Sequence, residues 1–297
     1  MDFKNWLRKK GYLYIFLAPS IIFMGIFTAY PIIYNFIISV QDVNVMTLAK
    51  PDKEFVGLQN YIDIITDSTF LVVFKNSVIF TVGSVFFQFI IGFALAMFLV
   101  KKFPLNNFVR GFIVVGWVIP PVVVGTVWKW LLNTDFGLIN YFLSQLHLFS
   151  NNISWLTNPD MAMIGILIAN IWLGIPFNMM LLIGGLTGLP QSVFEAAEID
   201  GANWFQKLFF LTIPMLRQTI SATLMLGIIY TFKVFALIWV MTGGGPVNAT
   251  NVLPTWSYQL SFDFFNFSQG AVVANLMFTI MLIFSIVYIN YIAGRED

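Results

Sequence analysis

Six long apolar runs, separated by charged or turn-forming segments, dominate the pattern of the chain. They cover approximately residues 12–40, 76–100, 109–132, 161–185, 216–241 and 270–292. Each is long enough for a helix to cross the hydrocarbon core of a bilayer, which takes about 20 residues. Because the runs lack the strict alternation of a transmembrane strand, we expect six membrane-spanning helices.

The composition agrees with an integral membrane protein. Hydrophobic residues make up 59% of the chain and charged residues 10%, against roughly 45–50% and 25% in soluble domains. We therefore predict an all-α, multi-pass protein in contact with membrane lipid, with residues 1–297 forming one transmembrane domain.

The residue content excludes several classes of protein. The sequence has no Cys and one His, His147, which rules out disulfides, Cys-ligated metal centres and HExxH zinc sites. No segment reads GxxxxGK[ST] or GxSxG, the signatures of P-loop ATPases and of hydrolase nucleophile elbows. A net charge of +1 gives no basic surface for nucleic acid. The chain is therefore predicted not to be an enzyme and to hold no metal or cofactor of its own.

The basic residues predict the orientation, because Lys and Arg in short loops stay on the cytoplasmic side. Three of them, Lys50, Lys53 and Lys75, fall in loops on the side away from the N-terminus. Ten fall on the side of the N-terminus: Lys4, Arg8, Lys9, Lys10, Lys101, Lys102, Arg110, Lys207, Arg217 and Arg295. We therefore expect both termini to lie in the cytoplasm.

The acidic residues bear on whether the chain could be a secondary carrier. All fourteen Asp and Glu residues lie outside the six apolar runs or at their edges. Proton-coupled carriers normally relay protons through a carboxylate at mid-membrane, so that class is disfavoured. A self-sufficient sodium-coupled carrier that binds its ion with backbone carbonyls is not excluded. It stays as one possible function of the chain.

Between the fourth and fifth runs, residues 189–214 are predicted to form two short cytoplasmic helices. Residues 191–200 are mostly good helix formers, and Gly201 suits a helix end that needs positive φ. Asn203, followed three residues later by Gln206, is a capping-box pattern that starts a second helix in a new direction.

This segment has two interpretations. Helices that lie on the bilayer surface normally carry Lys and Arg on their polar face, whereas the first helix carries Glu195, Glu198 and Asp200 and no basic residue. Ala196 and Ala197, beside these acids, would let another backbone approach closely. The pattern favours docking of a protein partner, and a lipid-surface role stays open.

Polar residues recur at helical spacing in the fourth and fifth runs. Four positions of each run share one helix face. They are Asn170, Leu173, Gly174, Phe177, Gly227, Tyr230, Thr231 and Val234. Amide and hydroxyl groups beside aromatic rings suit a sugar, whose hydroxyls form hydrogen bonds and whose C–H faces stack on rings. Small and polar residues also hold helices together in bilayers, which is the simpler explanation of the pattern taken alone.

Lys233 is the formal charge that lies well inside an apolar run. A charge at the centre of a transmembrane helix costs about 2.5 to 3.5 kcal/mol by insertion scales. Met241 follows eight residues later, which places Lys233 about 12 Å from the outer end of the predicted helix. Either the ammonium faces a substrate cavity, or the side chain extends to the outer surface.

The sequence resembles a known family, first of all in residues 189–214. Glu195, Ala196, Ala197, Gly201 and Pro214 stand at the spacing of the EAA signature of permease subunits of binding-protein-dependent ABC importers. The resemblance runs from about residue 10 to residue 292 and includes the segments FVGLQNY, GLIN, NIWLGIPF and MTGGGP. These segments look like the carbohydrate branch, and in particular like the larger permease of the maltose transporter. That permease has extra N-terminal helices and a large external insertion, where this chain has only a short loop.

The resemblance implies the fold of a type I ABC importer permease in a prokaryotic cytoplasmic membrane. Residues 189–214 would be the coupling element, seated in a cleft of a cytoplasmic ATPase, with Glu195, Ala196, Ala197, Asp200, Gly201 and Pro214 as its signature residues. The implied partners are a second homologous permease, a dimer of ABC ATPases that binds ATP and Mg, an external solute-binding protein and a carbohydrate. The chain would move that carbohydrate inward by alternating access.

The resemblance also bears on the polar helix faces. The eight positions of the fourth and fifth runs match those that line the sugar site of the maltose permease. Gly227, Thr231 and Val234 stand where that protein has larger or more polar groups, which implies a different sugar or a weaker contact in this subunit. Together with Lys233, the eight positions are the predicted substrate pathway.

Overall fold

The structure is a computed structural model that describes residues 16–101, 103–147 and 151–293. The chain divides into two compact units, one made of Met1–Asp67 and Ser257–Thr279 and the other of Ser68–Trp256 and Ile280–Asp297. Within the described residues the regular elements are helices, and strand-type pairing is limited to two isolated bridges. The predicted all-α class is therefore confirmed. A single domain over residues 1–297 stays a prediction.

A small, partly buried polar network links helices of the first unit. This unit contains the helical run Phe16–Ser39, which includes η1 (Gly25–Ala29) and α2 (Tyr30–Ser39), then α3 (Gln59–Thr66), η3 (Gln259–Asp263) and the first part of α15 (Phe267–Ala293). Asn35 Nδ2 of α2 donates to Asn275 Oδ1 of α15 at 2.7 Å. Asn275 Nδ2 in turn donates to Tyr61 Oη of α3 at 3.0 Å. Paired amides of this kind join helices where no water is available.

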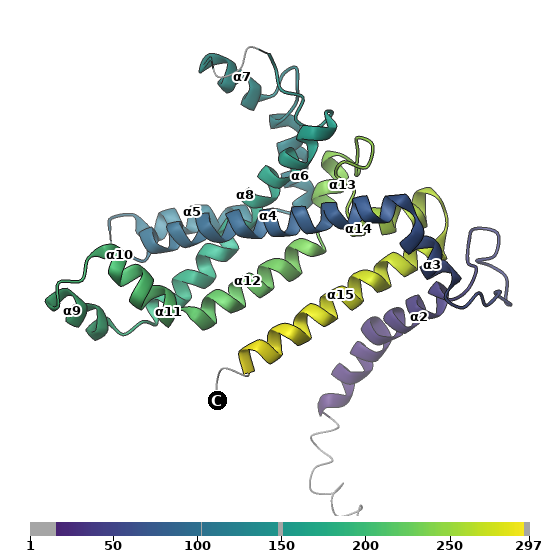
Figure 1. Cartoon of the computed structure of the whole chain (residues 1–297), viewed down its shortest axis with the longest axis horizontal. Helices are drawn as coiled ribbons and strands as arrows, with labels where there is room; N and C mark the ends of the chain where they lie inside the picture. Colours follow the sequence, from purple (N-terminus) through teal and green to yellow (C-terminus); the bar gives the residue numbers. More distant parts are fainter. Residues whose placement is uncertain (1–15, 102, 148–150, 294–297) are drawn as a thin grey trace, which may run out of the picture. The chain divides into compact units, whose positions relative to one another are not determined.

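The second unit is built around α4 (Ser68–Leu99) and α8 (Pro159–Thr187), which pack along one another, with α12 (Arg217–Phe232) against both (Figure 1). The other helices are α5 (Asn106–Val118), α6 (Pro121–Leu131), α7 (Leu138–Gln145), α9 (Gln191–Ile199), α10 (Trp204–Gln206), η2 (Lys207–Thr212), α11 (Ile213–Met215), α13 (Ala236–Met241) and the start of α14 (Leu253–Tyr258).

Two apolar clusters and a polar stripe make up the interior of the second unit. One cluster includes Phe80 of α4 and Ile166 of α8, and the other includes Ala96 and Met179, further along the same helices. On one face of α4, buried polar residues follow one another at spacings of four, three and four. They are Ser77, Thr81, Ser84 and Gln88. The stripe brings polar groups to the level between the two clusters.

The lengths of the helices agree in part with the six predicted spans. Within the described residues, four helices are long and apolar enough to cross a membrane: Phe16–Ser39, Ser68–Leu99, Pro159–Thr187 and Phe267–Asn290. Two bent helix pairs raise the number to six if each pair is one span. Helix α4 starts eight residues before the predicted run, because a charge such as Lys75 ends an apolar stretch without interrupting helical hydrogen bonds.

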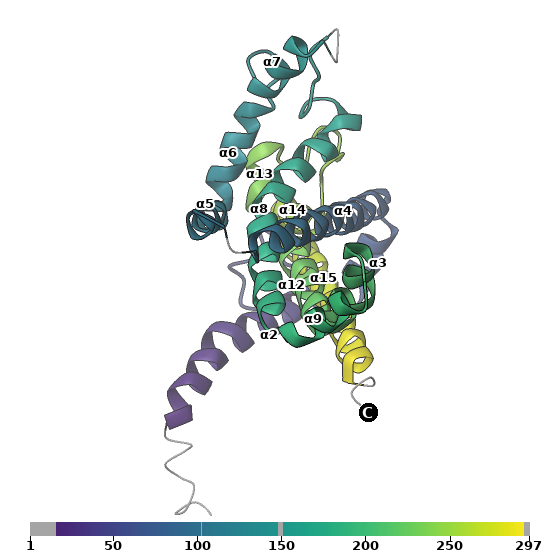
Figure 2. The same cartoon turned by 90° about the vertical axis from the view of Figure 1, so that its left-hand side faces the viewer.

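The third predicted span is wrong as a single helix. α5 and α6 meet at 96° (Figure 2). Pro120 and Pro121 supply the cause: neither has an N–H, and each forces the residue before it toward extended backbone. Ile119 accordingly has φ −66° and ψ 129°. The run 109–132 is therefore apolar throughout, but its helix is interrupted between α5 and α6.

The fifth predicted span is also wrong as a single helix. α12 ends at Phe232, and α13 begins at Ala236. Lys233 is the C-cap residue that follows α12, and it is exposed. It therefore does not sit inside a helix, as the run 216–241 suggested. At its other end, α12 is preceded by the helical stretch Trp204–Met215, which is bent from it by 70°.

Candidate functional site

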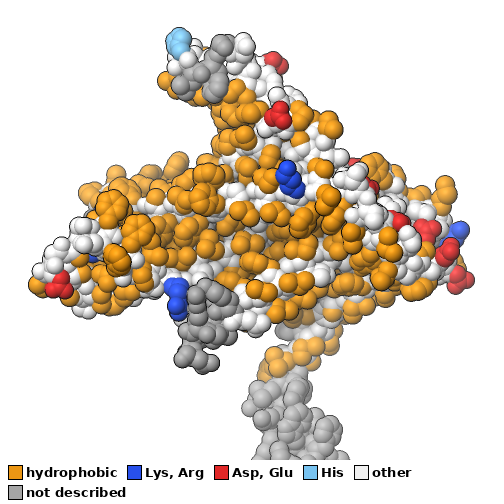
Figure 3. All heavy atoms as spheres, viewed as in Figure 1, with side chains coloured by type: hydrophobic (Ala, Val, Ile, Leu, Met, Phe, Trp, Pro, Cys, Tyr) orange, Lys and Arg blue, Asp and Glu red, His pale blue; other side chains and the backbone are white. Residues whose placement is uncertain are grey.

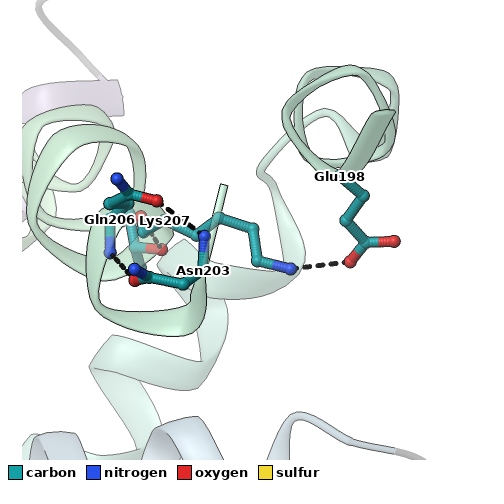
Figure 4. Close-up of polar contacts among 5 residues, drawn as sticks. Glu198, Asn203, Gln206 and Lys207 are labelled. Carbon is teal, nitrogen blue, oxygen red and sulfur yellow. Dashed lines mark hydrogen bonds and ion pairs between the residues drawn. The ribbon is translucent and has the colours of Figure 1, made fainter. Parts of the chain in front are cut away.

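The segment 189–214 folds as two helical pieces joined by a sharp turn. α9 ends at Ile199, and Gly201 follows with φ +78°, a backbone conformation that residues with a side chain rarely adopt. Asn203 Oδ1 then accepts from Gln206 N at 2.9 Å, while Gln206 Oε1 accepts from Asn203 N at 2.7 Å (Figure 4). The predicted glycine turn and capping box are both confirmed.

An ion pair braces the two pieces. Lys207 Nζ of η2 lies 2.7 Å from Glu198 Oε1 of α9 (Figure 4). Glu195, in contrast, is exposed and accepts a hydrogen bond from Gln191 Nε2 at 2.7 Å. Of the two acids, Glu198 therefore braces the loop internally, and Glu195 presents its charge outward.

The predicted coupling residues lie on the surface. Glu195, Ala196, Asp200, Gly201 and Pro214 are exposed, and Ala197 is half-buried. Figure 3 shows acidic side chains at the end of the second unit formed by α9. Ile199, between the acids Glu198 and Asp200, is also exposed, and a single apolar residue of this kind is common on protein surfaces.

A cavity of about 400 Å³ lies in the second unit between α4, α5, α8 and α12. Eight of the nine predicted pathway residues line it: Asn170, Leu173, Gly174, Phe177, Gly227, Tyr230, Thr231 and Val234. The other described lining residues are Gln88, Trp117, Ile119 and Pro121. The two helix faces inferred from spacing therefore meet at one cavity, whose volume is in the range of small-molecule sites.

The wall of the cavity combines amides, hydroxyls and aromatic rings. Asn170 is 3% exposed, and its Nδ2 has no hydrogen-bond partner among the described residues. Phe177 stands edge-on to Tyr230, with ring centroids 5.4 Å apart, and Trp117 lies 5.7 Å from Phe177. A buried donor without a partner is unfavourable unless a ligand or water satisfies it. The wall therefore offers ring faces to a ligand, and it holds one buried amide donor that is unpaired among the described residues.

Charge is kept off this wall. None of the described lining residues is Lys, Arg, His, Asp or Glu. Lys233 is not among them, and its Nζ lies 5.0 Å from the centroid of the Tyr230 ring. The cation therefore lies over the ring of a wall residue and is not itself a lining residue. Likewise, no group of three or more acidic or His side chains within the described residues is placed to hold a metal ion.

Gln88 and Trp117 were missed because they come from runs that the sequence analysis treated only as spans. For Gln88 a signal existed. Ser77, Thr81, Ser84 and Gln88 repeat at helical spacing and place four polar groups on one face of an otherwise apolar helix. Trp117 had no such signal, because aromatic residues are frequent throughout this chain.

The cavity and the braced loop belong to a known class of transport protein. Residues 88–295 match the family described as binding-protein-dependent transport system inner membrane component, and the chain belongs to this family. It is a membrane-embedded transport component, as the resemblance implied.

Relatives of known name lie within the same class. The chain is 32% identical to the trehalose/maltose transport system permease protein MalF of Thermococcus litoralis, over 97% of this chain and 95% of that protein. It is 28% identical to the diacetylchitobiose uptake system permease protein DasB of Streptomyces coelicolor, over 96% and 87%. A bacterial alginate ABC transporter, solved with a periplasmic protein bound to an alginate pentasaccharide, has a chain with the same fold: TM-score 0.84, 19% identity, and coverage of 100% of this chain and 98% of that one.

Proposed function

We propose that this chain is a permease subunit of an ATP-driven importer that carries a carbohydrate across the cytoplasmic membrane by alternating access. The observation that carries the proposal is the convergence of eight pathway residues on one uncharged cavity. Amides, hydroxyls and aromatic faces are the groups that bind neutral saccharides. Relatives named for trehalose or maltose and for diacetylchitobiose support the same substrate class.

The partners in this proposal follow from the surface of the segment 189–214. An exposed acidic helix with small residues, braced from within, suits docking into a cleft of a cytoplasmic ATPase, and two copies of that ATPase would bind ATP and Mg. A second homologous permease would complete the pathway. An external solute-binding protein would deliver the sugar, as the name of the family indicates. Glu195, Ala196, Ala197, Asp200, Gly201 and Pro214 are the proposed coupling residues.

The proposal includes six spans with both termini in the cytoplasm. Its support is the distribution of Lys and Arg, and the four helices and two bent pairs supply enough apolar length. Lys4, Arg8, Lys9, Lys10, Lys102 and Arg295, which contribute to that distribution, lie outside the described residues.

Reconstitution tests the function. The chain is purified with its companion permease and ATPase, placed in proteoliposomes with binding protein, and assayed for uptake of labelled maltose, trehalose and diacetylchitobiose. We expect uptake of at least one sugar that needs ATP and is indifferent to a sodium gradient. Uptake driven by sodium without ATP would establish the alternative carrier instead, for which the relatives give no support.

The coupling role has its own experiment. Glu195→Lys reverses an exposed charge at the proposed contact, while Glu54→Lys reverses an exposed charge in the segment assigned to the other side. Like charges at an interface oppose association. We expect binding-protein-stimulated ATP hydrolysis to fall about tenfold in the first variant and to stay unchanged in the second. Equal stimulated ATP hydrolysis in the two variants would show that Glu195 is not part of the contact with the ATPase.

The orientation can be tested cleanly because the sequence has no Cys. Single-Cys variants Ser192→Cys and Thr66→Cys place thiols at exposed positions in α9 and α3. In intact cells, a membrane-impermeant maleimide should label Thr66→Cys and spare Ser192→Cys, and permeabilisation should expose the latter. The reverse result would invert the topology.

A further inference from the structure

Gln88 is a buried amide that ties two helices together at the cavity. Its side chain is 4% exposed and lines the cavity from α4. Gln88 Nε2 donates to the backbone oxygen of Asn170 in α8 at 2.8 Å. If the amide were flipped, its oxygen would face that carbonyl oxygen, and the two acceptors would repel one another. The orientation of the Gln88 amide is therefore fixed.

Gly174 leaves the space in which this amide lies. A Cβ added at position 174 would stand 2.3 Å from Gln88 Cδ, 2.4 Å from Nε2 and 2.5 Å from Oε1. Gly174 lies within the helix α8, whose conformation any residue adopts, so the backbone does not require a glycine there. On the same helix, Gly184 has nothing within 4 Å of the corresponding point. The glycine at 174 thus leaves room for the Gln88 amide in the position that it occupies.

The part of α8 around Gly174 is also supported by packing against α4. Pro176 lies inside α8 and removes the ladder donor to the carbonyl of Trp172. Within the same stretch α4 also comes close at Gly92, where an added Cβ would stand 2.7 Å from Asn178 Cβ. Contacts from α4 therefore hold α8 in place at the level of the cavity, and the bond from Gln88 to Asn170 is one of them.

Two carboxamides consequently stand next to each other on one wall. Gln88 is fixed by its bond to the Asn170 backbone, and Asn170 keeps a side-chain donor without a partner among the described residues. A carboxamide offers both donors and an acceptor, and one held in a fixed orientation beside a second matches some patterns of sugar hydroxyls better than others. A site that pairs a hydroxyl discriminates strongly against a sugar that lacks it.

We propose that Gln88 is a specificity-determining residue of the cavity, and that Gly174 is a glycine in order to admit the Gln88 amide. The first part rests on the proposed function, because it concerns a carbohydrate in this cavity. The second part concerns packing between α4 and α8 and is tested without any sugar.

Selectivity is measured with Gln88→Leu, which keeps about the same volume and removes the amide. The complete complex in proteoliposomes is given saturating binding protein and maltose, trehalose or diacetylchitobiose in turn. Because both complexes receive the same binding protein, its own preference cancels in the variant-to-wild-type ratio for each sugar. Gln145→Leu, at an exposed glutamine at the end of α7, is the matched control.

We expect the ratio of turnover between sugars to change by about fivefold or more in Gln88→Leu and to stay unchanged in Gln145→Leu. An equal loss of turnover for every sugar would show that Gln88 only supports packing. That result would overturn its proposed role in specificity. If the wild-type complex carries none of these sugars with ATP, the proposed carbohydrate function itself fails, which is a different result.

The packing half is tested by rescue. Gly174→Ala should lower the melting temperature of the purified complex by about 3 °C or more, because overpacking strains both helices. Adding Gln88→Ala removes the obstructing amide and should recover most of that loss, while Gly184→Ala alone should change little. If the double variant is no more stable than Gly174→Ala, the glycine does not serve Gln88, and this half is overturned.

Discussion

The segment 189–214 and the cavity wall differ in how their shapes are determined. In the segment, Gly201, the Asn203–Gln206 capping box and the Glu198–Lys207 pair all act between residues close in sequence. In the wall, Gln88 bonds to a residue 82 positions away, and Phe177 and Tyr230 come from different helices. A turn or cap formed by residues close in sequence can be altered without disturbing the bundle. The wall residues, in contrast, depend on contacts with residues far away in sequence. Variants in the two regions should therefore fail in different ways.

The largest effect is expected at Gly201. Gly201→Val puts a β-branched residue at φ +78°, which costs about 2 kcal/mol or more and forces the turn to change. Stimulated ATP hydrolysis should fall about thirtyfold, while the amount of inserted protein stays normal. Gly184→Val, at a helical glycine with open space around it, is the control. Full coupling in Gly201→Val would show that the turn is not needed.

Asn170→Ala should have the next largest effect, and of a different kind. Removing the amide from the wall takes away a hydrogen bond worth about 1 to 3 kcal/mol, so we expect sugar uptake to fall about tenfold or more. ATP hydrolysis stimulated by binding protein should persist, because the loop is untouched. Asn152→Ala, at an exposed asparagine in the loop before α8, controls for the substitution. Parallel loss of sugar uptake and ATP hydrolysis would show that variants in the cavity wall and in the segment 189–214 fail in the same way.

Lys233→Met sharpens the chemistry of the wall. It keeps the stem length and removes a cation that lies over the Tyr230 ring and is not itself a lining residue. A cation–π contact at an exposed site contributes about 0.5 to 1 kcal/mol, so uptake of a neutral disaccharide should fall by about fivefold at most. Uptake of a uronic-acid oligosaccharide is measured in parallel. A selective loss of that anionic sugar would make Lys233 a substrate contact after all.

The smallest effect is expected for Glu198→Gln. The variant removes the ion pair with Lys207, but the Glu198 side chain is 64% exposed, and exposed pairs contribute about 0 to 1 kcal/mol. The melting temperature should shift by no more than about 3 °C, and transport should stay near normal. A coupling loss as large as that of Gly201→Val would mean that the pair, rather than the turn, holds the two helical pieces.

What could be foreseen from sequence follows the same division. The turn at Gly201 and the cap at Asn203 were predicted because the residues that specify them are neighbours. The pathway faces of α8 and α12 were predicted by helical spacing, and the structure brings both to one cavity. That this cavity binds a sugar stays a prediction.

The failures also have physical causes. Hydropathy registers how apolar a run is and not whether its backbone is continuous, so the break at Pro120–Pro121 and the end of α12 at Phe232 were hidden within the runs 109–132 and 216–241. The pairing of Gln88 with Gly174 depends on which helix lies beside α8. That is a question of tertiary packing which one sequence does not answer.

The two breaks have a mechanical consequence. α6 and α13 each begin just beyond one of them, and Lys129 Nζ of α6 donates to the carbonyl of Val240 in α13 at 3.1 Å. At Gly125, an added Cβ would stand 3.2 Å from the Leu237 carbonyl, so the two backbones also touch. α6 and α13 thus pack on one another beyond the two breaks, and Ile119 and Val234, at those breaks, line the cavity. A displacement of this pair would therefore move two residues of the wall together, which ties the width of the cavity to the position of α6 and α13.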